Sequence, residues 1–354
     1  MEKKRSKYIG IAALILLTAL GAAGCANRES GESSAAPSQS SAGAGGQTAE
    51  GQATEGPAAS GQASPAESSG QPGELRRVKD MKGETEIPAA PQRIVDISGA
   101  TEELLLLGFK PVGTANQDSL KPGGTPAYLQ EELTETQLVG NYASGEANLE
   151  QITALKPDLI VSSAMFDNVY EQLTRIAPVF VIEDDPLSFA GWRGRLVQLG
   201  AALGQEEKAA QWQKAYDEKA KAIGERIRTE AGEDSFAVVV AFPNNLSVFS
   251  GTGLGDMLYA DLELPRAPGV PAEGWGETIS LEGLTNIDAD RIFLQYMAGT
   301  EEELEGSVVW QNLKAVRGGH VYKLPNEEYY DMSFSPIGKE RLLDAIADLA
   351  APAS

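Results

Sequence analysis

The chain has 354 residues, enough for one large or two ordinary domains with a hydrophobic core each. Its 51 acidic residues outnumber 29 basic ones, and the resulting net charge of −22 repels phosphates, which argues against a nucleic-acid partner. One cysteine and one histidine exclude a disulfide within the chain and the multi-thiolate or multi-histidine clusters that bind zinc or manganese.

The first 24 residues have the pattern of an export signal. Basic side chains precede an apolar run, residues 9–20, that is too short to span a bilayer comfortably. The segment GAAGC then ends in Cys25 and resembles a bacterial lipoprotein lipobox, with Ala22 where Leu is commonest. We expect Cys25 to be lipidated and to anchor the protein on the extracytoplasmic face of the cell membrane. A plain secretory signal followed by a free thiol is the alternative.

Residues 25–75 form a second compositional segment. Ser, Gly, Ala, Gln and Pro dominate it, and large apolar side chains are almost absent. Such a segment cannot bury a core, so we expect a disordered tether between the lipid and a folded domain at 76–354.

From about residue 76 the sequence alternates between strand and helix patterns. RIVDIS (93–98) reads as a strand, TEELLLLGF as a helix that ends at Gly108, and PVGTA as a second strand. Two further helix–strand pairs follow, and their strands are almost entirely apolar. This alternation predicts a parallel α/β sheet in a first lobe, residues 76–188.

Residues 189–231 carry only helical patterns. In the second part of this stretch the apolar positions recur at helical spacing over about 25 residues, longer than the usual globular helix. We expect a rigid connecting helix, after which the α/β pattern resumes in a second lobe, residues 232–354. The apolar positions are Ala209, Trp212, Tyr216, Ala220, Ile223 and Ile227.

A weak internal repeat links the two lobes. NLEQITALKPDLIV, from Asn148, matches SLEGLTNIDADRIF, from Ser280. The repeat favours two similarly built lobes, with a cleft at the carboxyl ends of their strands. The identical pairs are Leu149/Leu281, Glu150/Glu282, Thr153/Thr285, Asp158/Asp290 and Ile160/Ile292.

These features together resemble the substrate-binding proteins of iron-siderophore and cobalamin ABC importers. The resemblance covers about residues 76–350 and rests on RIVDISGATEELLLLG, NLEQITALKPDLIV, ISLEGLTNIDADRIFL, VVWQNLKAVRGGHVYKLP and GDMLYADL. It implies a class III fold, in which two parallel-sheet α/β lobes are joined by one long rigid helix. It also implies a monomeric receptor that passes a ferric siderophore, with the hydroxamate type favoured, to an ABC permease dimer. No catalytic residue, resident cofactor or protein metal site is expected, since the siderophore already fills the coordination sphere of iron.

The resemblance also implies a surface glutamate on each lobe that docks to the permease. In the family pattern this residue lies six positions before a glycine, which assigns Glu102 ahead of Gly108. Asp256 is the counterpart in the second lobe, with Asp261 as the alternative. Glu102 also lies near a predicted helix N-terminus, where a carboxylate is favoured for structural reasons alone.

A siderophore cleft needs aromatic and apolar walls and a few donors, plus Arg or Lys if the ligand is anionic. Ordinary core packing is the competing interpretation for the aromatic residues, except for Trp275, which lies among glycines and does not resemble a core residue. Of the adjacent tyrosines we expect one to be buried and one free. The candidates that follow predicted strand ends or lie on the next helix are Asn116, Gln117, Met165, Phe166, Arg193, Arg195, Trp275, Tyr296, Met297, Tyr329 and Tyr330.

Three other functions compete with the siderophore receptor. A haem or corrinoid receptor of the same family could use Tyr329, Tyr330 or Met297 as an axial ligand. A secreted enzyme is disfavoured because the chain has no GxSxG motif and no second histidine, and His320 reads as a turn residue. A structural lipoprotein that binds nothing small is disfavoured by the two-lobed layout. The glycine-rich SGTGLG lacks the spacing and the lysine of a phosphate loop.

Overall fold

A computed structural model describes residues 73–183 and 191–352, which fall within one compact unit. The expected signal, Cys25 and nearly all of the tether lie outside the described residues, as does the boundary at 188/189. None of the helices in the described ranges combines the length and the apolar character that crossing a membrane requires.

The first lobe contains a five-stranded parallel sheet in the order β5-β4-β3-β8-β9. A hairpin precedes the sheet and closes its β9 edge, where the backbone N–H of Met81 donates to the Val181 carbonyl at 3.0 Å. The strands are β1 (Leu75–Asp80), β2 (Gly83–Pro88), β3 (Ile94–Asp96), β4 (Gly113–Thr114), β5 (Gln137–Leu138), β6 (Gly140–Asn141), β7 (Glu146–Ala147), β8 (Leu159–Ser162) and β9 (Val179–Val181). The helices are α1 (Thr101–Leu107), η1 (Ala127–Leu129), α2 (Leu149–Ala154), η2 (Ala164–Val169) and α3 (Tyr170–Leu173).

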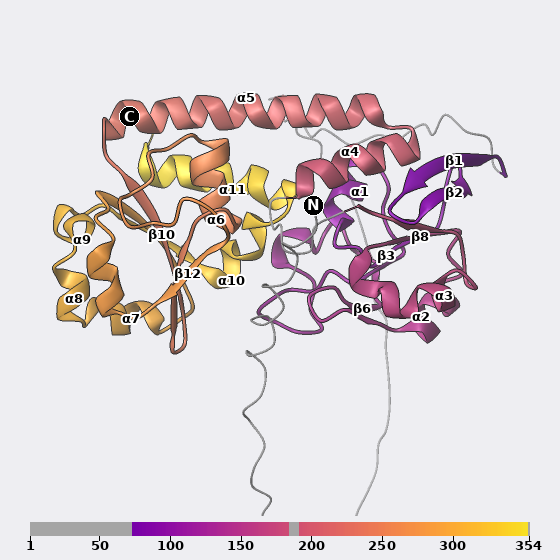
Figure 1. The fold of residues 1–354 in the computed structure, drawn as a ribbon, viewed down its shortest axis with the longest axis horizontal. Coiled ribbons are helices and arrows are strands. Elements are labelled where there is room, and N and C mark those ends of the chain that lie inside the picture. The colour runs from indigo at the N-terminus through magenta and orange to yellow at the C-terminus, as the bar shows by residue number, and fades with distance from the viewer. Residues whose placement is uncertain (1–72, 184–190, 353–354) are drawn as a thin grey trace, which may run out of the picture. The chain divides into compact units, whose positions relative to one another are not determined.

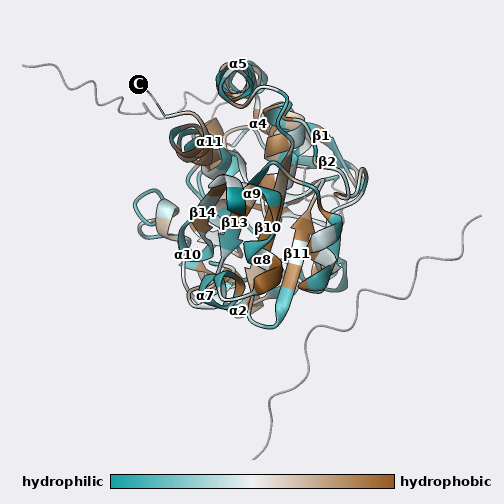
Figure 2. Ribbon diagram, turned by 90° about the vertical axis from the view of Figure 1, so that its left-hand side faces the viewer, coloured by the Kyte–Doolittle hydropathy of each residue, from teal (hydrophilic) through white to brown (hydrophobic). Residues whose placement is uncertain are grey.

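The second lobe contains a five-stranded sheet in the order β12-β11-β10-β13-β14. β10, β13 and β14 are parallel, whereas β11 and β12 are antiparallel additions. Figure 2 shows β10 and β11 in the brown of apolar residues, as expected for strands covered by helices. The strands are β10 (Phe236–Phe242), β11 (Asn245–Phe249), β12 (Gly276–Ile279), β13 (Arg291–Tyr296) and β14 (Val321–Pro325). The helices are α6 (Gly253–Asp256), η3 (Met257–Asp261), η4 (Glu282–Asn286), α7 (Thr300–Glu305), α8 (Val308–Gln311), α9 (Lys314–Gly318), α10 (Asn326–Tyr329), η5 (Asp331–Ser333) and α11 (Pro336–Ala350).

The expected connecting helix is present as α5 (Glu206–Ala231, 26 residues), which follows α4 (Trp192–Leu203) (Figure 1). Ala209, near its start, belongs to the first-lobe core, whereas Tyr216 and Ile227 belong to the second-lobe core. Trp192 contacts Trp212 and Tyr216 with ring centroids 5.7 and 5.1 Å apart, so one aromatic cluster joins both cores. The prediction of two α/β lobes joined by one long helix is confirmed.

The internal repeat has a structural counterpart in each lobe. The Asp158 carboxylate accepts the backbone N–H groups of Gln92 and Arg93 at 2.7 and 2.9 Å, just before β3. The Asp290 carboxylate accepts the N–H of Ser235 at 2.9 Å, just before β10. In each lobe this aspartate connects the start of the central strand to the loop before the neighbouring parallel strand. Asp158 and Asp290, which the repeat matches, therefore have equivalent structural roles.

Candidate functional site

The first-lobe side of the site lies at the carboxyl ends of β3, β4 and β8. Asn116 follows β4, and its amide nitrogen lies 3.5 Å from the Gly99 carbonyl oxygen after β3. Gln117 is fixed more firmly: its amide donates to the Gly140 carbonyl at 2.6 Å and accepts the N–H of Gly123 at 2.7 Å. Asn116 and Gln117 therefore lie at the carboxyl ends of the strands of this sheet, as predicted.

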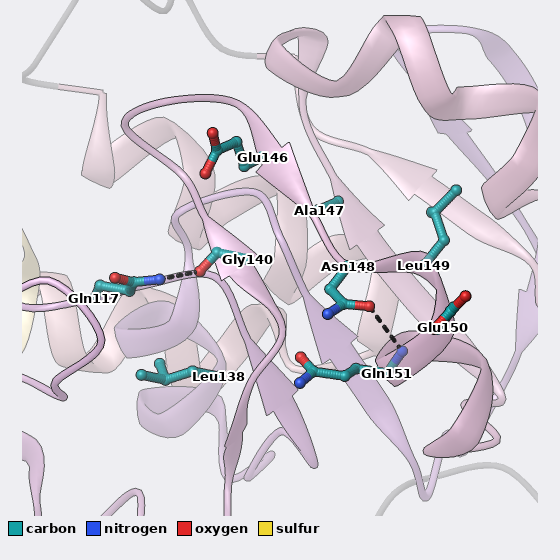
Figure 3. Close-up of a pocket in the computed structure, with 9 residues that line it drawn as sticks. All are labelled: Gln117, Leu138, Gly140, Glu146, Ala147, Asn148, Leu149, Glu150 and Gln151. Carbon is teal, nitrogen blue, oxygen red and sulfur yellow. Dashed lines mark hydrogen bonds between the residues drawn. The ribbon is translucent and has the colours of Figure 1, made fainter. Parts of the chain in front are cut away.

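An open cavity of about 750 Å³ lies beside this edge (Figure 3). The Gln117 amide points to Gly140, and the Asn148 side chain accepts the Gln151 N–H at 3.1 Å, capping α2 (Figure 3). The walls of the cavity are mostly polar, and all of the residues that line it belong to the first lobe. They are Gln117, Leu138, Gly140, Glu146, Ala147, Asn148, Leu149, Glu150 and Gln151.

The second-lobe side of the site is aromatic. Phe242 ends β10 and lies edge-to-face against Tyr330, with ring centroids 5.4 Å apart. Tyr330 also contacts Phe334 at 5.1 Å, and burial raises the pKa of Tyr330 to about 12, so its hydroxyl keeps its proton. Tyr329 precedes it at the end of α10, and Tyr296 ends β13. Tyr296 thus lies at the carboxyl end of β13, and Tyr329 and Tyr330 come after the carboxyl end of its parallel neighbour β14.

A direct contact brings the two sides together. The backbone N–H of Ser119, two residues after Gln117, donates to the Asp331 carboxylate at 2.9 Å. Asp331 immediately follows Tyr330, and burial raises its pKa above the ordinary value for aspartate. The loop carrying Asn116 and Gln117 therefore meets the segment carrying Tyr329 and Tyr330 across the lobe boundary.

Trp275 and Met165 are surface residues, but neither joins this group through a described contact. Trp275 is 45 % exposed and lies edge-to-face on Phe249, consistent with the prediction that it is not a core residue. The pairing of Phe249 with Val238 places Trp275 nearer the start of β10, away from Phe242. Met165 is 37 % exposed beside Gly145.

Phe166 is not a ligand contact in this structure. Its side chain is fully buried in the first-lobe core with Ile97 and Ile160. The competing interpretation, ordinary packing, was the right one for this residue, because the η2 turn after β8 directs it back onto the sheet.

The two candidate arginines are both paired with carboxylates of this chain. Arg195 is 8 % exposed and donates to the Glu103 carboxylate at 2.7 Å. Arg193 forms ion pairs at 2.8 Å with Asp217 and with Asp261, and its guanidinium lies over the Trp192 ring. The buried pair with Glu103 corrects the expected ligand contact of Arg195. The Arg193 side chain is 37 % exposed, and its partner Asp217 is 58 % exposed, so a ligand contact of Arg193 stays a prediction.

The carboxylates assigned to docking are also internal. Glu102 is 1 % exposed and accepts hydrogen bonds from Tyr128 and from the start of α11. Asp256 pairs at 2.8 Å with Lys339, which is fully buried. Its alternative, Asp261, is held by the Tyr216 hydroxyl at 2.7 Å as well as by an arginine. The structure therefore corrects these assignments: none of the three carboxylates is free to meet a permease.

Two aromatic residues of the site were missed by sequence reasoning. Phe242 ends β10, and its place before a Pro-Asn-Asn turn marks it in the sequence as a strand-end residue. Tyr142 lies against Gly99, where a Cβ atom would come within 3.1 Å of its ring. Within the described ranges no three His, Cys, Asp or Glu side chains are grouped so that they could hold a metal ion.

The sequence model of a family described as periplasmic binding protein matches residues 98–328. The iron(3+)-hydroxamate-binding protein FhuD of Bacillus subtilis is 26% identical over 292 residues, which cover 79% of this chain and 88% of that protein. The probable siderophore-binding lipoprotein YfiY of the same organism is 28% identical, covering 71% and 80%. The crystal structure of Staphylococcus aureus SirA complexed with staphyloferrin B is 27% identical, with a TM-score of 0.65 over 77% of this chain and 97% of that one.

Proposed function

Because the chain belongs to the periplasmic binding protein family, we propose that it is a lipid-anchored extracytoplasmic receptor that binds a ferric siderophore between its lobes and delivers it to an ABC permease. The observation that carries this proposal is the Ser119–Asp331 contact, which joins the Asn116/Gln117 loop to the Tyr329/Tyr330 segment. The loop that carries the two amides thereby meets the segment that carries the aromatic rings, an arrangement suited to an oxygen-rich chelate with an apolar surface. The relatives named for iron-hydroxamate and siderophore binding support the same ligand class.

The charge of the site favours a neutral or cationic ferric complex. The amides and aromatic rings at the lobe boundary are uncharged, and the charges of Arg193 and Arg195 are offset by paired carboxylates. Asp331 adds an acidic group beside Tyr330. Three hydroxamates neutralise Fe³⁺, whereas three catecholates leave an anionic complex that would normally be met by arginine or lysine. We therefore place the ligand among the ferric hydroxamates.

A charge-matched ligand series tests this class. A linear ferric trihydroxamate with a terminal ammonium, its N-acetyl derivative and its N-succinyl derivative differ in charge but share the iron centre. Titration monitored by tryptophan fluorescence should give comparable affinity for the first two and about 10-fold weaker binding of the anionic third. Equal or tighter binding of the anionic complex would contradict the charge argument. Saturable binding of haem with a Soret shift, and of no ferric complex, would support the haem alternative.

Delivery to a permease requires exposed docking groups, and the internal repeat supplies a replacement for the buried pair. Glu150 lies in the first turn of α2, and Glu282 lies in the first turn of η4. Both are exposed, and they are equivalent positions of the repeat whose aspartates tie down the two central strands. We propose Glu150 and Glu282 as the docking pair.

Uptake and binding separate docking from ligand recognition. Glu150→Ala and Glu282→Ala should each abolish siderophore uptake by cells. Glu282→Ala should leave the ligand affinity of the purified protein unchanged, because Glu282, unlike Glu150, does not line the cavity. Glu171→Ala and Glu303→Ala remove exposed glutamates from the same lobes and serve as controls. Normal uptake by the Glu150/Glu282 double variant would eliminate this pair.

A further inference from the structure

Glu102 joins the two lobes through its carboxyl group. It belongs to α1 of the first lobe, and its side chain is 1 % exposed. One oxygen accepts the Tyr128 hydroxyl at 2.6 Å. The other accepts the backbone N–H groups of Ile337 and Gly338, in the first turn of α11 of the second lobe, at 2.8 and 3.0 Å.

Helix α11 depends on this carboxyl for its N-terminal cap. The first N–H groups of a helix have no partner within the helix and need an acceptor from elsewhere. Ser335 is the N-cap residue, yet its side chain makes no capping hydrogen bond, and Pro336 has no N–H. The next two donors are those of Ile337 and Gly338, and Glu102 accepts both. A residue 235 positions earlier in the chain therefore accepts the hydrogen bonds that the side chain of the N-cap residue usually accepts.

Other hydrogen bonds and an ion pair near Glu102 also connect the two lobes. Arg341, one turn further along α11, donates to the Tyr128 carbonyl and pairs with Glu132 at 2.5 Å. The Ser119–Asp331 hydrogen bond lies on the segment that leads from Tyr330 into α11. The position of the α11 N-terminus is thus connected to the residues that we assign to the ligand.

We propose that Glu102 is a positioning residue: by capping α11 from the opposite lobe, it fixes the orientation of the lobes and the spacing of Gln117 from Tyr329 and Tyr330. The effect on ligand affinity rests on the proposed function. The effect on the junction itself needs no ligand.

The pH dependence of the junction has a definite sign. Burial raises the pKa of Glu102 to about 7, and the adjacent Glu103 adds to the increase, while the hydrogen bonds from Tyr128 and α11 oppose it. Tyr128 stays protonated because burial and Glu102 raise its pKa well above 10. A carboxyl released to water returns to its ordinary pKa of 4.5, so the formed junction binds the proton more tightly than the opened one. The junction should therefore strengthen as the pH falls from about 7 toward 4.5.

The remaining charged groups that face the junction do not reverse this sign. On α11, Lys339 is paired with Asp256, and Arg341 is paired with Glu132. On η5, burial raises the pKa of Asp331, so this carboxyl also favours the formed boundary in acid.

Hydrogen exchange at two amides tests the proposal without ligand. In Glu102→Ala, the Ile337 and Gly338 amides should exchange about 10-fold faster or more, because each loses a charged acceptor. In Glu102→Gln the amide oxygen still accepts both N–H groups, so protection should be retained and should vary less between pH 5 and 8 than in wild type. Tyr128→Phe is a milder change and should accelerate exchange of these amides by a smaller factor than Glu102→Ala. It replaces Glu102→Ala in the test if Glu102→Ala folds poorly. Glu131→Ala, at an exposed glutamate, is the control.

Ligand affinity provides the second measurement. A ferric trihydroxamate should bind wild type more tightly at pH 5.5 than at pH 8. The affinity of Glu102→Gln should depend less on pH than that of wild type, and Glu102→Ala should bind more weakly at both pH values. Unchanged protection of Ile337 and Gly338 in Glu102→Ala would overturn the proposal. If wild type binds no ferric complex, the proposed function fails, while the exchange result still decides the role of Glu102.

Discussion

Replacing Arg195 by methionine tests whether this side chain serves the fold or the ligand. Arg195 and Glu103 form an ion pair at 2.7 Å, with side-chain exposures of 9 % and 0 %. Removing one partner of a buried pair leaves the other charge uncompensated, which typically costs about 3–5 kcal/mol of unfolding free energy. Burial already raises the pKa of Glu103 despite the attraction of Arg195. Without the arginine the carboxyl should take up a proton in the folded state, so the loss should be smaller at pH 5 than at pH 8.

Urea unfolding of Arg195→Met at these two pH values measures the effect. Arg226→Met, at an exposed position on α5, is the matched control and should change stability by less than about 0.5 kcal/mol. The double variant Glu103→Leu/Arg195→Met should recover most of the loss, because no buried charge remains. The folded fraction of Arg195→Met should bind ligand normally. A loss below about 1 kcal/mol together with much weaker binding would refute the structural assignment and return Arg195 to the site.

Three further predictions concern single residues. Trp275→Ala should leave ligand-dependent fluorescence quenching largely intact in a titration, because Trp275 lies on Phe249, away from Phe242, and loss of the quenching would return Trp275 to the site. The Asp290 carboxylate is stabilised by Lys314 and by backbone hydrogen bonds, which lower its pKa to about 2. Asp290→Asn should therefore lower the unfolding free energy by up to about 1 kcal/mol at pH 7, and the difference should shrink in urea titrations as the pH falls from about 4 toward 2. Gly338→Ala would place a Cβ atom 2.5 Å from the Met332 backbone, so its thermal midpoint should fall by several degrees; an unchanged midpoint would mean that η5 can move away.

The parts of the fold that depend on local periodicity could be predicted from the sequence. Apolar spacing located α5, and strand–helix alternation located the lobes. The repeat that includes Asp158 and Asp290 predicted two similarly built lobes, and in the structure both aspartates bind the start of a central strand. Strand-end position also selected Gln117 and Tyr330 correctly as residues at sheet edges, because parallel strands present their carboxyl ends together.

The roles of individual charged residues could not be predicted, because they depend on partners distant in the chain. Glu102 near a helix start looks like a solvated carboxylate until α11 is placed against it. Arg195 on a predicted helix surface similarly looks exposed until Glu103 is placed beside it. Phe166 was misassigned for a different reason: a turn after a strand can direct a side chain into the cleft or back to the core, and the sequence does not show which.

Calorimetric titration of the signal-free protein with a ferric trihydroxamate tests the central claim most directly when wild type is compared with Gln117→Ala and Tyr329→Ala. These residues lie on opposite sides of the lobe boundary that the Ser119–Asp331 contact joins. We predict one saturable site in wild type and binding that is about 10-fold weaker in each variant, because each lobe supplies part of the site. The absence of saturable binding, or full affinity in both variants, would contradict a siderophore site between the lobes.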